Sequence, residues 1–354
     1  PAPYLSFRKG ADPTSGIEFA NSTPRFSTNY PPLHSRAALL VETHMLKPYG
    51  WRVKATYDLL VALLEELRRA PRALTDAVRR SEADAATLGS RHGDVVLNTT
   101  LSDKTDAFLY KGKVAVLEDS PITGGRVPHY TDSTYEARIP LYRDAVPSLT
   151  VKAPAGYLVP QEWSPVVELL QTHGIAFRRL VNAWRDTVEV TRVLEWSMDP
   201  QTFEGHHMVR VTKVATERQV RSFRPGDLWV PCDQRSGALV VHLLEAQAPD
   251  GVLAWNAFDT IFQRKEYAED YVMEPIARQM MARDPRLAAE FKARVAADST
   301  FARNPAARID WFYRRSPWAD PEQDLDPVAR AMHELPNSVF SAVRPSTRSL
   351  APRR

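Results

Sequence analysis

A carboxylate and an imidazole follow an apolar run near the start of the sequence. Residues 37–41 are all aliphatic, and Glu42 and His44 come directly after them. In an extended strand these two side chains share a face, because successive side chains alternate between faces. Ligands of α/β sheets bind beyond the carboxyl ends of strands, so both side chains would point into a site at the edge of the sheet. The spacing leaves one alternative equally open, a structural ion pair between Glu42 and a neighbouring arginine.

His242 and Glu245 form a second pair that could bind a metal ion. They match the pattern H-x-x-E, and on a helix residues three apart share a face. A zinc site needs at least a third protein ligand. The next histidine along the chain, His333, has no supporting motif around it. Aliphatic residues surround the pair, so ordinary packing of a buried helix is the favoured interpretation.

Several other classes of function are excluded. The sequence has no G-x-S-x-G motif, no P-loop and no G-x-G-x-x-G motif. Its one cysteine, Cys232, rules out an intrachain disulfide and has no nucleophile signature. The 46 basic and 43 acidic residues nearly balance, which argues against a nucleic-acid partner. The apolar runs are far shorter than the roughly 20 residues that span a bilayer, so no membrane span is expected.

The elements that must position Glu42 can be predicted around it. Residues 1–36 are rich in Pro, Ser, Thr and Asn and predict loop, whereas residues 37–41 predict a buried strand. A long helix is predicted over 50–70, and a more polar helix over 72–88. In the first helix the apolar residues recur at spacings of four and three, which makes one stripe (Val53, Tyr57, Leu60, Leu64 and Leu67).

The sequence pattern changes again further along the chain. Short β-type runs separated by glycines predict a β-rich domain over 93–153, and alternating strands and helices predict a mixed domain over 154–254. From 255 onward the pattern is helical, and Asp284 and Asn304 each precede a proline in the order that starts a helix. The fold class is therefore expected to be mixed α/β and multidomain.

Residues 25–30 and 35–49, with the helix that follows, resemble the end of a zinc carboxypeptidase catalytic domain. The family is the carboxypeptidase A-like metallopeptidases, in particular a large bacterial subgroup with a long C-terminal extension. In that family the final core strand ends in the catalytic glutamate and a long helix follows, and Glu42 falls on that glutamate. Residues 262–268 and 310–315 resemble the extension, although the resemblance is strongest over about residues 24–68.

The resemblance implies a peptide or protein substrate and one zinc ion. Family members hold the zinc through an upstream H-x-x-E pair and a later histidine, and the metal activates a water molecule. Glu42 would take a proton from that water as general base. Tyr30 and Arg36 would contact the substrate by position, and His44 would line the same site by strand parity. Many relatives are exported, so a periplasmic or secreted location is expected.

The zinc ligands of the family are not found in this sequence. No H-x-x-E pair precedes Glu42, and His34 is the only histidine among the 41 residues before it. We therefore expect the ligands in an N-terminal catalytic portion, in the same precursor or as a separate chain. The start at Pro1, without an initiator methionine, favours the same interpretation. This chain alone is expected to be inactive.

The expected organisation is the last strand and helix of a carboxypeptidase-like α/β domain, followed by a β-rich domain, a mixed α/β domain and a helical C-terminal region. The boundaries are 1–70 for the end of the catalytic domain, 71–92 for a helical connector, 93–153 for the β-rich domain, 154–254 for the mixed domain, 255–335 for the helical region and 336–354 for a mobile tail. Two alternatives stay open. One is a non-catalytic pseudo-peptidase that binds peptide or protein, and the other is an unrelated hydrolase that uses His242 and Glu245.

Overall fold

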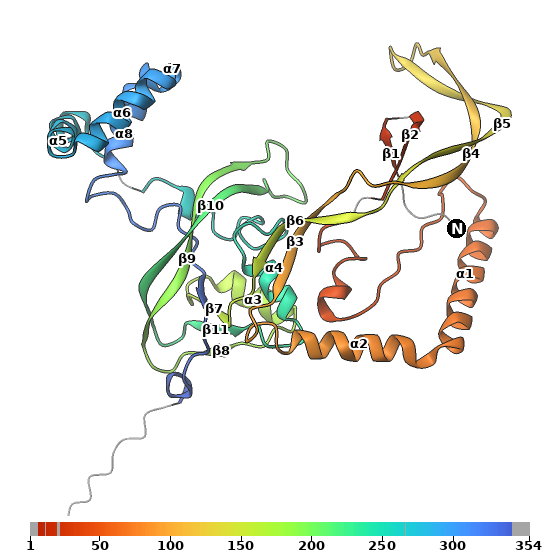
Figure 1. Cartoon of the computed structure of the whole chain (residues 1–354), viewed down its shortest axis with the longest axis horizontal. Helices are drawn as coiled ribbons and strands as arrows, with labels where there is room; N and C mark the ends of the chain where they lie inside the picture. The colour runs from red at the N-terminus through yellow and green to blue at the C-terminus, as the bar shows by residue number, and fades with distance from the viewer. Residues whose placement is uncertain (1–5, 11, 20–21, 266, 342–354) are drawn as a thin grey trace, which may run out of the picture.

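A mixed α/β body lies in the middle of an elongated molecule, as Figure 1 shows. The computed structural model describes residues 6–10, 12–19, 22–265 and 267–341. An arm of long strands and two helices extends from one side of the body, and a small helical unit lies at the other. The fold is mixed α/β, as predicted.

The body is built on a six-stranded sheet with the strand order β10-β9-β12-β7-β11-β8, in which all pairs are antiparallel. The strand that comes last in the sequence, β12, lies between β7 and β9 and pairs with both. Two helices, α3 and α4, contribute to the main hydrophobic core beside it. The bounds are β7 (Gly156–Val159), α3 (Ser164–Thr172), β8 (Arg178–Arg179), β9 (Trp184–Met198), β10 (Val209–Phe223), β11 (Leu228–Pro231), α4 (Gly237–Leu244) and β12 (Ala329–Ala331).

The arm contains a four-stranded sheet that the sequence pattern predicted only in part. Residues 1–36 were expected to be loop, but two strands form within them, and β2 pairs in parallel with β5 through Ile17 and Leu141. Ile17 is 1% exposed, so a sheet contact with a distant segment makes this strand. A two-stranded ribbon of β3 and β6 leads from the arm to the body. The bounds are β1 (Ser6–Lys9), β2 (Asp12–Glu18), β3 (Asp94–Leu101), β4 (Asp106–Asp119), β5 (Arg126–Tyr142) and β6 (Ala145–Lys152).

Two successive helices, α1 (Tyr49–Arg69) and α2 (Pro71–Ala85), run along the outside of the arm. They confirm the two helices predicted over 50–70 and 72–88. The strand predicted over 37–41 is wrong, because these residues are extended but belong to no strand, and 37–40 are exposed. A strand is stabilised by hydrogen bonds to a neighbouring strand, and this segment has none beside it in the described part of the chain.

The helical unit near the C-terminus confirms the predicted helix starts. The Asp284 side chain accepts hydrogen bonds from two backbone amides at the start of α6, and Asn304 accepts one at the start of α8. Of the predicted tail 336–354, residues 342–354 lie outside the described residues, whereas η3 buries Val339 against the body. The bounds are η2 (Asp259–Phe262), α5 (Asp270–Arg283), α6 (Pro285–Ala297), α7 (Ser299–Ala302), α8 (Pro305–Tyr313) and η3 (Asn337–Phe340).

Candidate functional site

Glu42 lies on an exposed, extended segment that connects the short helix η1 (Pro31–His34) to α1. Both Glu42 and His44 are exposed, and the His44 Nδ1 accepts a hydrogen bond from the backbone amide of Leu46 at 3.2 Å. Residues 37–40 are exposed as well, with Leu39 at 60%. A run of exposed aliphatic side chains is unusual for a stable surface and is typical of a contact surface.

Helix α1 also presents its apolar stripe to solvent. None of its 21 residues is buried, and Tyr57 and Leu64 are each 65% exposed. Most long helices in proteins are stabilised by packing of such a stripe rather than by intrinsic propensity. Among the helices of the described residues, none is long and apolar enough to cross a membrane. The segment 37–69 therefore carries two adjoining apolar surfaces that the described residues leave open.

Tyr30 and Arg36 come just before this segment in the sequence. Tyr30 contacts the body, and Arg36 contacts α2. The Tyr30 hydroxyl lies 2.7 Å from the His173 Nδ1, at the end of α3. The Arg36 guanidinium donates to the Glu82 carboxylate on α2 at 2.7 Å. Tyr30 and Arg36 are therefore held by contacts to His173 and to Glu82 of α2, whereas Glu42 and His44 lie on the exposed segment. The four residues predicted for one site are not gathered into one within this chain.

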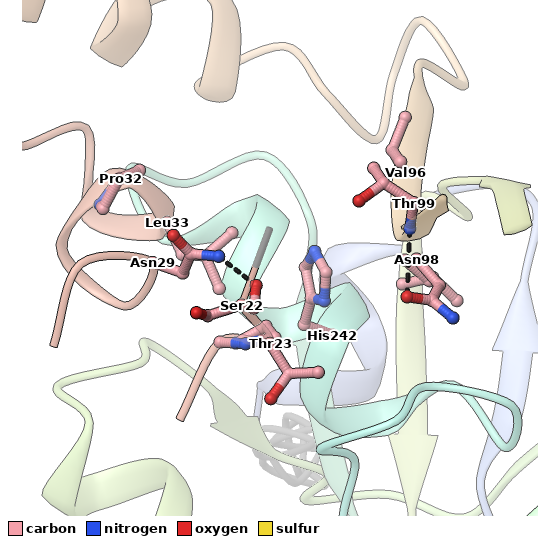
Figure 2. Close-up of a pocket in the computed structure, with 11 residues that line it drawn as sticks. Ser22, Thr23, Asn29, Pro32, Leu33, Val96, Asn98, Thr99 and His242 are labelled. Carbon is pink, nitrogen blue, oxygen red and sulfur yellow. Dashed lines mark hydrogen bonds between the residues drawn. The ribbon is translucent and has the colours of Figure 1, made fainter. Parts of the chain in front are cut away.

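A small cavity of about 240 Å³ lies where the loop around residues 22–33 meets β3 and α4 (Figure 2). His242 lines it together with Asn98 of β3 and Thr23 of the loop. Burial lowers the pKa of His242 to about 4, so the ring is neutral at pH 7. Sequence analysis missed this cavity, since its lining comes from three segments that no local pattern connects.

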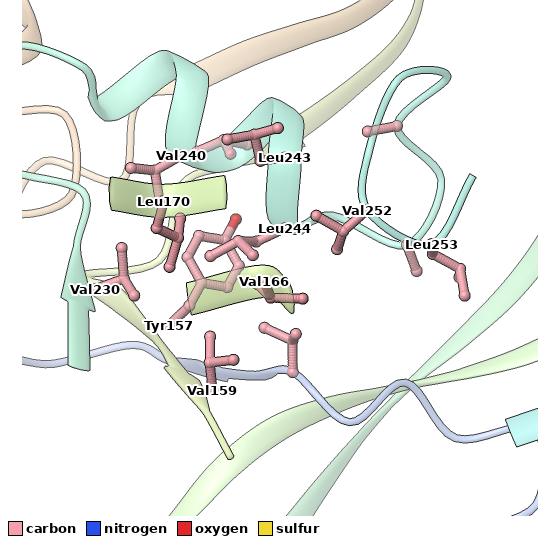
Figure 3. Packing of buried hydrophobic residues seen from close by; sticks show 14 of the residues in the cluster. Tyr157, Val159, Val166, Leu170, Val230, Val240, Leu243, Leu244, Val252 and Leu253 are labelled. Atoms are coloured by element: carbon pink, nitrogen blue, oxygen red, sulfur yellow. The ribbon is translucent and has the colours of Figure 1, made fainter. Parts of the chain in front are cut away.

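Glu245, the partner of His242 in the H-x-x-E pattern, is held in a separate buried network. The Tyr157 hydroxyl donates to the Glu245 Oε1 at 2.6 Å, and the Arg330 Nε lies 3.0 Å from the same oxygen. Arg330 also donates to the Glu189 carboxylate at 3.0 Å. Figure 3 shows the Tyr157 ring among the aliphatic side chains of the core. His242 thus belongs to the packed helix α4, as predicted, whereas Glu245 follows the last turn of that helix with an extended backbone.

Cys232 is buried in the same core, and burial raises the pKa of its thiol far above the usual range. A thiol that stays protonated is a poor nucleophile. The structure therefore agrees with a packing role for this residue.

Comparison with known proteins gives a partial match. A segment of 119 residues, 33% of this chain, is 31% identical to Carboxypeptidase 2 of Trichophyton rubrum. Part of this chain is similar to fungal carboxypeptidases. Carboxypeptidase 2 of Trichophyton tonsurans and Probable carboxypeptidase 2 of Arthroderma benhamiae are 27% and 28% identical over 32% and 29% of the chain. The chain spans about a fifth of the length of these curated relatives.

No family model matches the chain, and no solved structure matches it. The carboxypeptidase similarity is distant and covers about a third of the sequence.

The residues present do not fit a zinc ion. A catalytic zinc site uses three protein ligands, and within the described ranges no three or more His, Cys, Asp or Glu side chains converge. Glu245 is already occupied by Tyr157 and Arg330, which also removes support for a hydrolase built on His242 and Glu245. No chemical step through a metal can be assigned to these residues.

Proposed function

We propose that this chain is the C-terminal portion of a zinc-dependent metallocarboxypeptidase-like peptidase. Glu42 would be its general base, and the zinc ligands would lie in an N-terminal catalytic portion, in the same precursor or as a partner chain. The observation that supports this most strongly is the exposed segment 37–69, an aliphatic run, a glutamate and an amphipathic helix with their apolar faces open. The partial similarity to carboxypeptidases points to the same class of protein.

The apolar surfaces of residues 37–69 would be stabilised by packing against another apolar surface. Burying one leucine side chain stabilises a complex by about 1.5–3 kcal/mol, and the stripe on α1 holds three leucines besides Val53 and Tyr57. An extended aliphatic segment can pair with the edge of a sheet through its backbone amides and carbonyls. The sheet of the N-terminal catalytic portion would supply both contacts, because α1 would pack on a sheet face while residues 37–41 extended its edge.

Pairing of this kind would give Glu42 its function. Once residues 37–44 joined a sheet, Glu42 and His44 would lie on one face at the carboxyl end of the strand. The Glu42 carboxylate would then take a proton from the attacking water and pass it to the leaving amine of the peptide. His44 would line the same site. Tyr30 and Arg36 would serve as substrate contacts only by leaving His173 and Glu82, which hold them in this structure.

Hydrogen exchange in the complete protein tests this proposal. The amides of α1 are expected to exchange at least ~100-fold more slowly in the complete protein than in this chain alone, because burial of two leucines corresponds to about 3–6 kcal/mol. Helix α4 is buried in both cases and serves as the internal control. Equal exchange of α1 in both proteins would contradict the proposal.

Metal analysis gives an independent result. About one zinc ion per molecule is expected in the complete protein, and none in this chain alone. Stoichiometric zinc in this chain alone would overturn the ligand argument and return His242 and Glu245 to consideration. A complete protein that protects α1 but binds no zinc and cleaves no peptide would instead support the non-catalytic pseudo-peptidase.

A further inference from the structure

Two histidines and a tyrosine meet where the loop that precedes Glu42 contacts the body. The Tyr30 ring contacts both imidazole rings, with its centroid 4.8 Å from that of His34 and 5.4 Å from that of His173. Its hydroxyl is 2.7 Å from the His173 Nδ1. The His34 Nδ1 lies 3.3 Å from the Ser236 Oγ, just before α4. We call Tyr30, His34, His173 and Ser236 the clasp.

The clasp connects segments that are far apart in the sequence. Tyr30 directly precedes η1, and His34 is its last residue. His173 directly follows α3, and Ser236 directly precedes α4. Eight residues after His34 the chain reaches Glu42. The clasp therefore joins the start of the exposed segment to the folded body.

The charged groups near the clasp disfavour protonation of His34. Arg36 lies two residues after His34 in the sequence, and its guanidinium donates a hydrogen bond to Glu82 of α2. From the side of α4, Arg235 contacts the same carboxylate at 3.1 Å. Glu82 is thus shared by two guanidinium groups, and this cluster has a net positive charge. A protonated His34 would meet Arg36 and would have no acidic partner of its own among the residues that the structure describes.

Burial also disfavours protonation of both rings. The His34 Nε2 is buried and has no hydrogen-bond partner among the described residues, so a proton there would lose its water without gaining an acceptor. Burial lowers the pKa of His34, and Arg36 lowers it further. Burial lowers the pKa of His173 as well, followed by the effect of His34. Burial raises the pKa of Tyr30, which keeps its hydroxyl neutral.

We propose that the clasp is an acid-sensitive contact that holds residues 26–36 on the body at neutral pH and releases them when His34 and His173 take up protons. An unfolded histidine has a pKa of about 6.5, above that of each of these half-buried rings. The contribution of the clasp to stability is therefore complete above about pH 6.5 and is lost as the pH falls below it. In the complete protein, release would free the segment that carries Glu42, a consequence that rests on the proposed function.

Hydrogen exchange of this chain as a function of pH tests the clasp without any assay of activity. After correction for the intrinsic rate, protection of residues 26–36 is expected to be constant above about pH 6.5 and to fall between about pH 6.5 and pH 5, by about tenfold for each pKa unit of the combined shift. Strand β9, whose Val188 and Val190 lie in the core of the body, reports on unfolding of the body itself. Protection that stays constant over this range would overturn the proposal.

A double variant, His34→Gln with His173→Gln, removes both titrating groups and is expected to abolish the pH dependence of residues 26–36. His129→Gln is the matched control, because His129 lies exposed on the arm with Glu118 and should leave that dependence unchanged. The same pH dependence in the double variant would contradict the proposal. If the double variant does not fold, the imidazole signals of the unmodified chain decide by NMR, since pKa values at or above about 6.5 for both rings would overturn it.

Discussion

Glu42→Gln in the complete protein should lower kcat/KM for peptide hydrolysis by about 100- to 10,000-fold, the range that a positioned general base contributes. The amide has nearly the shape of the carboxylate but cannot accept the proton from the attacking water. Because Glu42 is exposed and has no hydrogen bond or ion pair within the part of the chain that the structure describes, the fold and the zinc content should be unchanged. Steady-state kinetics on the complete protein, with zinc analysis of the same sample, give the measurement.

Glu65→Gln provides the matched control for this change. Glu65 lies on the polar side of α1, is exposed like Glu42, and is 23 positions away in sequence (65 − 42). Its substitution should leave kcat/KM within about twofold. Full hydrolysis by the Glu42→Gln protein would sink the general-base assignment, whatever the hydrogen-exchange result for α1.

Arg330→Met should lower the free energy of unfolding of this chain by about 3–5 kcal/mol, because it leaves the Glu245 carboxylate buried without its cation. Both side chains are largely buried, and Arg330 also holds Glu189 and donates to the Lys152 carbonyl at 2.5 Å. These contacts attach β12 to the sheet near the end of the chain. Urea unfolding of the unmodified and substituted chains measures the loss.

Two further variants compare the stability contribution of this buried ion pair with that of an ion pair on the surface. Arg278→Met removes a partner of Glu274 on the exposed side of α5 and should cost less than about 1 kcal/mol. Arg330→Met combined with Glu245→Gln should lose less stability than Arg330→Met alone, because no uncompensated charge stays buried at that position. A loss for Arg330→Met as small as that for Arg278→Met would contradict the buried network.

Local sequence patterns predicted the helices and their starts well. The spacing of Tyr57 and Leu64 predicts α1, and the side chains of Asp284 and Asn304 cap helices at the expected positions. These features depend on residues within one or two turns of each other, so no distant segment has to be known. The helix predicted at His242 was confirmed for the same reason, whereas Glu245 lies just after its end and contacts the distant residues Tyr157 and Arg330.

Elements that depend on distant partners could not be predicted. The strand β2 forms because Ile17 meets Leu141, and β12 forms because Ala329 and Ala331 meet β7. The strand predicted over 37–41 fails for the converse reason, since an aliphatic run becomes a strand only beside another strand. The clasp and the cavity beside His242 likewise combine segments that no sequence spacing relates.

By itself the sequence determined which residues favour a helix, which faces are apolar, and that Glu42 follows an aliphatic run before an amphipathic helix. Only the tertiary structure decided which of those faces are covered. Tyr157 and Leu244 are buried among partners, whereas the apolar stripe of α1 and the residues before Glu42 are open to solvent. Hydrophobicity measures the free energy available from burial, but burial itself needs a second surface, and the sequence pattern does not say where that surface lies.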